Sequence, residues 1–199
     1  RKSYLNAIEY LDKSIRIYLK INNPDYNLYR RISTAYLNTG IIYYQLKDYK
    51  TAMLFLDKSS ELKLKYDLPE KALVYLNLAK TYSKIGNRVK AEEYYNKSAS
   101  SFKSEFGESN YRIVELYFDY ALFLRLCGKY SDSFEILHRA SDICIKNYGD
   151  KHAVTSLSYK YLGDNYTYQN KYDSALFYYQ KSLVAVVKDF NDPAIFTNP

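Results

Sequence analysis

Four stretches of this chain repeat one pattern of small residues, and this repetition constrains the fold more than any other feature. A first small residue recurs at steps of 39, 42 and 42 positions, as Gly40, Ala79, Ala121 and Gly163. A second follows twelve positions later each time, as Ala52, Ala91, Ser133 and Ala175. Antiparallel helices approach closely only where neither carries a bulky side chain, so each pair predicts a crossing between a first helix, A, and a second helix, B.

Large residues surround each predicted crossing, and turn residues separate the two helices. The large residues are Tyr36, Tyr75, Tyr117 and Tyr159 from helix A and Leu56, Tyr95, Leu137 and Tyr179 from helix B. Gly86 and Gly128 predict turns with a positive φ, and Lys47 and Asn170 stand at the same place in the other repeats. Because one hairpin cannot cover its own apolar face, we predict an all-α fold, a right-handed α-solenoid of antiparallel helix hairpins with about nine helices.

The same pattern predicts one continuous array over residues 1–199. Its parts are helix B of a truncated repeat at 1–21, full repeats at 26–66, 69–105, 110–147 and 152–188, and the start of a further repeat or a tail at 191–199. The expected helices cover 4–21, 26–46, 49–66, 69–85, 88–105, 110–127, 130–147, 152–169 and 172–188. Since both ends fall inside a repeat, we expect a fragment of a longer protein.

These columns resemble the tetratricopeptide repeat. The family pattern is met in the last repeat by Tyr159, Leu162, Gly163, Tyr166, Tyr172 and Ala175. The 42-residue spacing and the turn 148–152 also resemble kinesin light chains and the arrays that precede caspase-like CHAT protease domains in bacteria, although Ala153 stands where that family usually has proline. The resemblance implies a superhelical scaffold that binds proteins or peptides, and the Lys-, Asn-, Tyr- and Ile-rich composition favours a bacterial source.

Curvature of stacked hairpins places helix A of each repeat on the concave surface. The positions expected to face inward are Leu37, Ile41, Tyr44 and Gln45, then Leu76, Lys80, Ser83 and Lys84, then Phe118, Leu122 and Arg125, and finally Lys160, Asp164 and Tyr168. An extended peptide could pack against the apolar members of this groove while Lys80, Lys84 and Arg125 attract acidic groups.

Asn38 and Asn77 stand two residues before a crossing, where the tetratricopeptide family often carries an asparagine that clamps the backbone of a bound peptide. The resemblance implies that role for these two residues. Asp119 and Tyr161 interrupt the column, and the lysine and asparagine order of the chaperone-type carboxylate clamp is absent, which argues against a C-terminal EEVD ligand. The alternative, that these polar residues only solvate the groove, stays open.

The sequence gives no sign of catalytic, metal or cofactor chemistry. It contains no GxxxxGK[ST], GxSxG or HExxH motif, and His138 and His152 lack a second histidine or cysteine at ligand spacing, so we expect both to be structural. The net charge of +7 invites a nucleic-acid hypothesis, but 29 basic residues are interspersed with 22 acidic ones and form no basic stripe. No apolar stretch is long enough to predict membrane insertion.

The two cysteines, Cys127 and Cys144, fall near opposite ends of one predicted hairpin. We therefore expect free thiols, which suit a reducing, cytoplasmic compartment. The leading hypothesis is a noncatalytic scaffold for a protein or peptide segment, or for a neighbouring domain of the same parent chain. The alternatives are a regulatory or sensor segment of a larger signalling enzyme, kinase or protease whose catalytic domain lies elsewhere, and RNA binding by stacked helical repeats.

Overall fold

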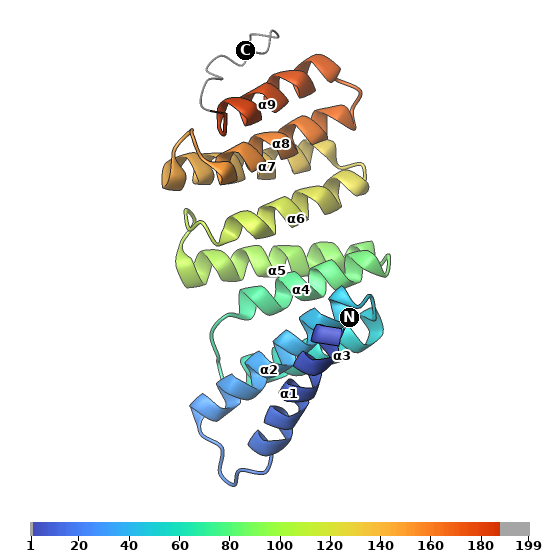
Figure 1. Ribbon diagram of the computed structural model, residues 1–199, viewed down its shortest axis with the longest axis vertical. Coiled ribbons are helices and arrows are strands. Elements are labelled where there is room, and N and C mark those ends of the chain that lie inside the picture. The colour runs from blue at the N-terminus through green and yellow to red at the C-terminus, as the bar shows by residue number, and fades with distance from the viewer. Residues whose placement is uncertain (1, 188–199) are drawn as a thin grey trace. The chain divides into compact units, whose positions relative to one another are not determined.

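A computed structural model describes residues 2–187, and the chain divides into two compact units, Arg1–Glu105 and Phe106–Pro199. Within the described residues all regular structure is helical, in nine α-helices without strands (Figure 1). The predicted fold class, an all-α solenoid of antiparallel helix hairpins, is confirmed. The expected start of a further repeat at 191–199 lies outside the described residues, and the single continuous array stays a prediction.

The first unit contains α1 (Lys2–Tyr18), α2 (Tyr26–Gln45), α3 (Tyr49–Lys65), α4 (Lys71–Lys84) and nearly all of α5 (Arg88–Phe106). Helices α2 and α3 form one hairpin, against which α1 packs on one side and α4 on the other. Helices α4 and α5 form the next hairpin, in which the Ser98 hydroxyl donates to the carbonyl of Ala72 at 2.8 Å. Each hairpin is thus one repeat.

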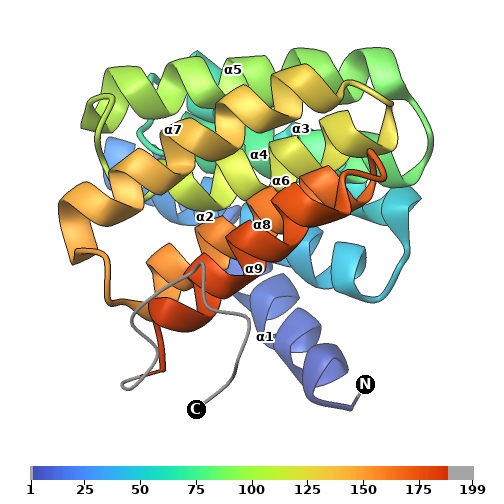
Figure 2. The same cartoon turned by 90° about the horizontal axis from the view of Figure 1, so that it is seen from above.

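The second unit contains α6 (Ile113–Leu126), α7 (Tyr130–Tyr148), α8 (Ala153–Thr167) and α9 (Tyr172–Val184). Helix α7 packs between α6 and α8, and α9 runs beside α8 (Figures 1 and 2). Because successive helices are antiparallel, α6 and α8 run in the same direction. Both are helices of type A.

The glycines at the crossings are required by close approach. A Cβ added to Gly40 would lie 2.7 Å from Leu56 Cγ and 3.2 Å from the carbonyl oxygen of Ala52. A Cβ on Gly163 would lie 2.7 Å from the Tyr179 ring. In the other hairpin of the second unit, the Ser133 hydroxyl donates to the carbonyl of Ala121 at 2.9 Å. The small-residue columns therefore mark helix crossings, as predicted.

The expected turn conformations are also present. Gly86 and Gly128 have φ of 80° and 78°, and Lys47 and Asn170 adopt φ of 64° and 58° at the same place in their repeats. The left-handed conformation strains a residue with a side chain, yet lysine and asparagine tolerate it here as single residues. The turn geometry is therefore a property of the repeat and does not depend on glycine.

Three helix ends differ from the prediction by three residues or more. Helix α1 ends at Tyr18 instead of 21, because the chain turns toward Asn23, which has a φ of 54°. Helix α6 begins at Ile113 instead of 110, because the Asn110 side chain accepts a hydrogen bond from the Arg112 N–H at 2.9 Å and holds a turn there. Helix α9 ends at Val184 instead of 188, and the amine of Lys151 donates to the Val184 carbonyl at 2.6 Å.

Candidate functional site

The predicted groove residues of the first unit lie on α2 and α4, and most of them reach solvent. Asn38 and Lys84 are exposed, and the half-buried members are Ile41, Tyr44, Asn77 and Lys80. We call the solvent-facing side of α2 and α4 that these six residues form the helix-A surface. The amide nitrogen of Asn77 donates to the Leu73 carbonyl of its own helix at 2.8 Å, so this group is already engaged.

Three predicted groove residues are buried instead of lining an open surface. Leu37, Leu76 and Phe118 retain only 5%, 3% and 8% of their exposure. All three stand at the same position in their repeats, three residues before the crossing. For Phe118 the reason is visible within the second unit, since its ring stacks on Tyr161 of α8, the next helix A, at 4.6 Å between ring centres. The prediction that they face the groove is therefore corrected.

In the second unit, the predicted charged residues have partners within the unit. Arg125 is 7% exposed, and its guanidinium lies 4.5 Å from the centre of the Tyr168 ring. The Lys160 amine donates to Asp164 at 3.2 Å, and the other carboxylate oxygen of Asp164 accepts from the Tyr179 hydroxyl at 2.9 Å. Leu122 remains exposed. Asp164 thus links α8 to α9, whereas the Lys160 side chain remains 55% exposed.

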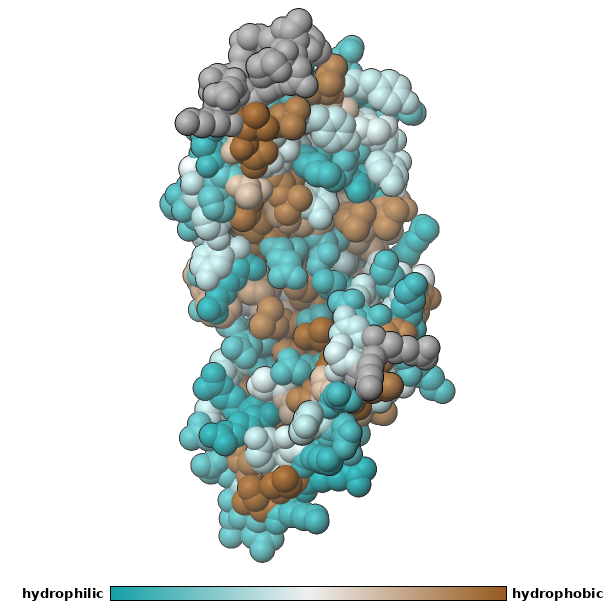
Figure 3. Space-filling model, viewed as in Figure 1, coloured by the Kyte–Doolittle hydropathy of each residue, from teal (hydrophilic) through white to brown (hydrophobic). Residues whose placement is uncertain are grey.

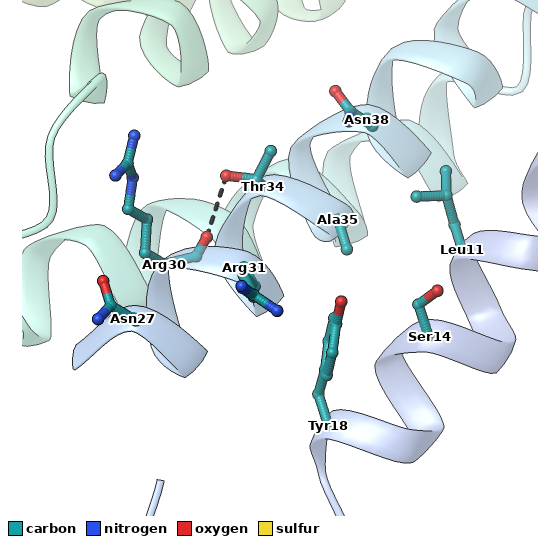
Figure 4. Close-up of a pocket in the computed structure, with 9 residues that line it drawn as sticks. All are labelled: Leu11, Ser14, Tyr18, Asn27, Arg30, Arg31, Thr34, Ala35 and Asn38. Carbon is teal, nitrogen blue, oxygen red and sulfur yellow. Dashed lines mark hydrogen bonds between the residues drawn. The ribbon is translucent and has the colours of Figure 1, made fainter. Parts of the chain in front are cut away.

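A pocket of about 510 Å³ opens between α1 and α2 in the first unit. Its described lining consists of Leu11, Ser14, Tyr18, Asn27, Arg30, Arg31, Thr34, Ala35 and Asn38. In Figure 4, Arg31 extends from α2 toward Tyr18 of α1, and Asn38 lies farther along α2. Asn38 is the residue of the predicted set that lines this pocket. The other lining residues were missed, although the adjacent pair Arg30–Arg31 near the start of a helix A was a visible signal.

The pocket combines positive charge with apolar side chains. Its described lining includes two arginines and no aspartate or glutamate. A guanidinium presents a rigid fork of donors that matches the two oxygens of a carboxylate. The hydroxyl of Thr34 is already engaged, because it donates a hydrogen bond to the Arg30 carbonyl at 3.0 Å. Leu11, Tyr18 and Ala35 add apolar area beside these charges.

The described residues contain no candidate metal site. Among them, no three His, Cys, Asp or Glu residues are grouped to hold a metal ion, and no helix is long and apolar enough to span a membrane. His152 accepts a hydrogen bond from the Val154 N–H at 3.1 Å and so caps α8. His138 lies against Phe134 at 4.2 Å, and burial lowers the pKa of its imidazole. Both histidines have the structural roles that the sequence predicted.

The two cysteines are free, as expected. Cys144 is completely buried, and burial raises the pKa of its thiol to about 11. A thiol with so high a pKa is protonated at neutral pH, and the thiolate is the reactive form. Cys144 is therefore a packing residue and not a nucleophile.

Stacked helix hairpins with small residues at every crossing and helix-A residues at the surface define a helical-repeat protein of the scaffold type. The sequence model of the tetratricopeptide repeat family matches residues 31–104 and 112–183, so the chain belongs to the tetratricopeptide repeat family. Proteins with this fold typically mediate protein–protein interactions. No curated protein sequence matches the chain.

Solved structures of other repeat proteins share the fold. BtubC (BKLC) from P. vanneervenii is 16% identical and superposes with a TM-score of 0.78 over 96% of this chain and 77% of its own. A putative kinesin light chain from Podosopora anserina, with nearly identical TPR-like repeats, is 14% identical with a TM-score of 0.74, over 92% of this chain and 86% of its own. The MamA protein is 16% identical with a TM-score of 0.60, over 92% and 90%. At these identities the likeness concerns the fold alone.

Proposed function

We propose that this chain is a noncatalytic scaffold that binds an acidic segment of another protein through its first unit. The observation that carries the proposal is the α1–α2 pocket, which combines Arg30 and Arg31 with an apolar floor and has no acidic residue in its described lining. Burying a carboxylate against a guanidinium is favourable only when the charges are matched, so this lining selects acidic over basic segments.

The helix-A surface extends the same preference along α2 and α4. Asn38 is shared by the pocket and the helix-A surface, and Lys80 and Lys84 stand on α4. An acidic segment that leaves the pocket at Asn38 would meet these two lysines next. The groove residues of the second unit contribute less to this proposal, because Arg125, Lys160 and Asp164 are occupied by neighbouring side chains.

The test is selection of peptides by the purified 199-residue chain from a random library displayed on phage. We expect enrichment of segments rich in Asp and Glu, with binding that weakens as salt is raised, because exposed charges are screened. Replacing both arginines by glutamate, as Arg30→Glu with Arg31→Glu, should abolish the enrichment, and Lys80→Glu with Lys84→Glu should reduce it. Enrichment that favours neutral or basic peptides equally would refute the proposal.

The cytoplasmic location and the bacterial source remain proposals, supported by the two free cysteines and the composition. The hypotheses of a regulatory segment within a larger enzyme and of RNA binding stay predictions. The peptide selection also addresses RNA binding, because a polyanion added as competitor should displace the selected acidic peptides from the chain.

A further inference from the structure

The turns that connect a helix A to its helix B carry a one-sided charge pattern in the first unit. They join α2 to α3 and α4 to α5, and both lie at the same end of their hairpins (Figure 1). Repeats stack through the sides of their helices, so such turns stay at the surface however many repeats are joined. We call residues 46–50 and 85–90 together the turn edge.

The turn edge is basic. Its positive charges come from four exposed side chains, Lys47, Lys50, Arg88 and Lys90. In the described part of the chain, none of these four forms an ion pair. The one acidic residue, Asp48, accepts a hydrogen bond from the Thr51 N–H at 3.1 Å and so caps α3. Positive charge therefore gathers here without a carboxylate at ion-pair distance.

The opposite end of the same hairpins is balanced in charge. In the turn between α3 and α4, Asp67 forms an ion pair with Lys71, and the carboxylate of Glu70 lies 3.9 Å from the amine of Lys63. The turn edge differs from this turn because its cations are left for a partner outside the hairpin.

Two aliphatic side chains stand among the cations of the turn edge. Ile85 is 47% exposed and Val89 is 78% exposed, the highest value for a large apolar residue in the described part of the chain. Figure 3, in the same view as Figure 1, shows hydrophobic and hydrophilic side chains next to one another along this edge. Transfer of these two side chains into an apolar phase would be favourable.

The second unit carries the same combination at its own turns of this type. Leu126 and Tyr172 are 58% and 64% exposed, and they stand near Lys129 and Lys171 in the sequence. A tyrosine joins an apolar ring to a polar hydroxyl, so it suits a boundary between water and an apolar phase. Exposed apolar or amphipathic residues beside lysines therefore recur where a helix A turns into a helix B.

We propose that the turn edge binds the surface of an anionic lipid membrane. Its cations contact the headgroup phosphates, and Ile85 and Val89 enter the boundary between headgroups and acyl chains. This inference goes beyond the proposed function, since residues 46–50 and 85–90 belong neither to the α1–α2 pocket nor to the helix-A surface.

A fluid lipid surface fits the turn edge better than a folded protein or RNA does. Specific protein–protein interfaces bury about 800 Å² on each partner, which two exposed aliphatic residues on a turn do not supply. Proteins that bind single-stranded RNA stack its bases on aromatic rings, and Ile85 and Val89 have none. Lipids rearrange around a turn of any shape, and each basic residue near an anionic surface strengthens adsorption.

The experiment combines the 199-residue chain with vesicles of phosphatidylcholine alone or with equal parts of phosphatidylglycerol. The chain contains no tryptophan, so Val89→Trp introduces a single fluorescent reporter in the turn edge. Leu64→Trp is the matched control, because Leu64 is 60% exposed near the other end of α3. Fluorescence titration measures adsorption, and circular dichroism checks that each variant folds.

We expect the emission of Val89→Trp to shift to shorter wavelength with the anionic vesicles only, and to be quenched by lipids with brominated acyl chains. Leu64→Trp should show neither change. Cosedimentation with the anionic vesicles tests the native valine, and Val89→Ser should reduce the adsorption of the chain by roughly threefold, because less apolar area is buried.

The charges are tested in the Val89→Trp background. Lys50→Gln with Arg88→Gln should weaken adsorption by roughly tenfold or more, since each basic residue near an anionic surface contributes about fivefold. Lys20→Gln with Lys65→Gln removes the same charge from the other end of the hairpins. This control should change adsorption by less than about threefold, because charges farther than a Debye length from the lipid are screened.

Equal adsorption to neutral and anionic vesicles, or an emission of Val89→Trp that does not change, overturns the proposal. An equal loss in the test pair and in the control pair of glutamine substitutions also overturns it, because adsorption then follows net charge and not the turn edge. Binding of homopolymer RNA or of acidic peptides that depends on Lys50 and Arg88, without adsorption to vesicles, would assign the turn edge to another polyanion.

Discussion

Substituting alanine for Gly40 tests the helix crossing, because two opposing effects of known size meet at this position. In a helix interior, replacing glycine by alanine normally stabilises a protein by about 0.5–1 kcal/mol. Here the new Cβ would lie 2.7 Å from Leu56 Cγ, 2.8 Å from Leu56 Cδ2 and 3.2 Å from the Ala52 carbonyl oxygen. Leu56 is completely buried.

Overpacking of this kind costs about 1–3 kcal/mol, so the expected result for Gly40→Ala is a net loss of about 1–2 kcal/mol. Urea denaturation of the whole chain measures it, with an unchanged slope if the native structure is kept. The comparison that isolates the contact is Gly40→Ala in a Leu56→Ala background. Without the leucine side chain the clash disappears, and the same substitution should stabilise the protein by the ordinary helix-propensity gain.

The cycle has an outcome that would contradict the crossing. If Gly40→Ala stabilises the wild type as much as it stabilises the Leu56→Ala background, the two residues do not compete for space. The small column would then reflect composition and not helix contact. Leu56→Ala alone should cost about 2–5 kcal/mol of unfolding free energy. The comparison therefore requires that the Leu56→Ala variant still folds. The unfolding transition of each variant is then located at moderate urea concentrations.

Two further predictions concern other parts of the core. Ile8→Phe should raise the melting temperature, because the larger ring fills a cavity of about 320 Å³ beside Tyr43 and Phe55. The expected gain in unfolding free energy is about 0.5–2 kcal/mol, and Phe134 already holds the same repeat position in α7. An unchanged or lower melting temperature would count against this packing. Burial raises the pKa of the Cys144 thiol from 9.0 to about 11, so the folded state keeps a proton that the unfolded chain loses. The stability that the protonated Cys144 thiol contributes is complete below pH 9 and is lost as the pH rises toward 11. In denaturation measured across this pH range, the unfolding free energy of Cys144→Ala should therefore fall less than that of the wild type.

The repeat architecture was predictable because its signals are local in sequence. Gly40 and Ala52, twelve residues apart, already specify which helices cross, and the positive φ of Lys47 follows from the length of the turn between them. Helix ends were less predictable. The start of α6 depends on a single hydrogen bond from the Arg112 N–H to Asn110, which competes with the first helical turn and leaves no pattern in the sequence.

Sequence patterns did not predict which residues are buried between repeats. Lys63 is 1% exposed, although a lysine in a helix B reads as a surface residue. Its amine donates to the Pro69 carbonyl at 2.6 Å and lies 3.9 Å from Glu70, and burial lowers the pKa of the amine. These partners come from the loop between α3 and α4, two helices that pack on each other.

The position two residues before the crossing shows why a repeat column does not determine a binding role. Asn38 lines the pocket, Asn77 donates to its own helix, and Tyr161 packs against Phe118. The backbone environment of the three residues is the same, and what differs is whether another helix of type A occupies the adjacent place. Tyr161 is a packing residue because α6 lies beside it, whereas Asn38 faces open space next to two arginines. The proposed site therefore uses Asn38 together with the other residues of the α1–α2 pocket, and not the column as a whole.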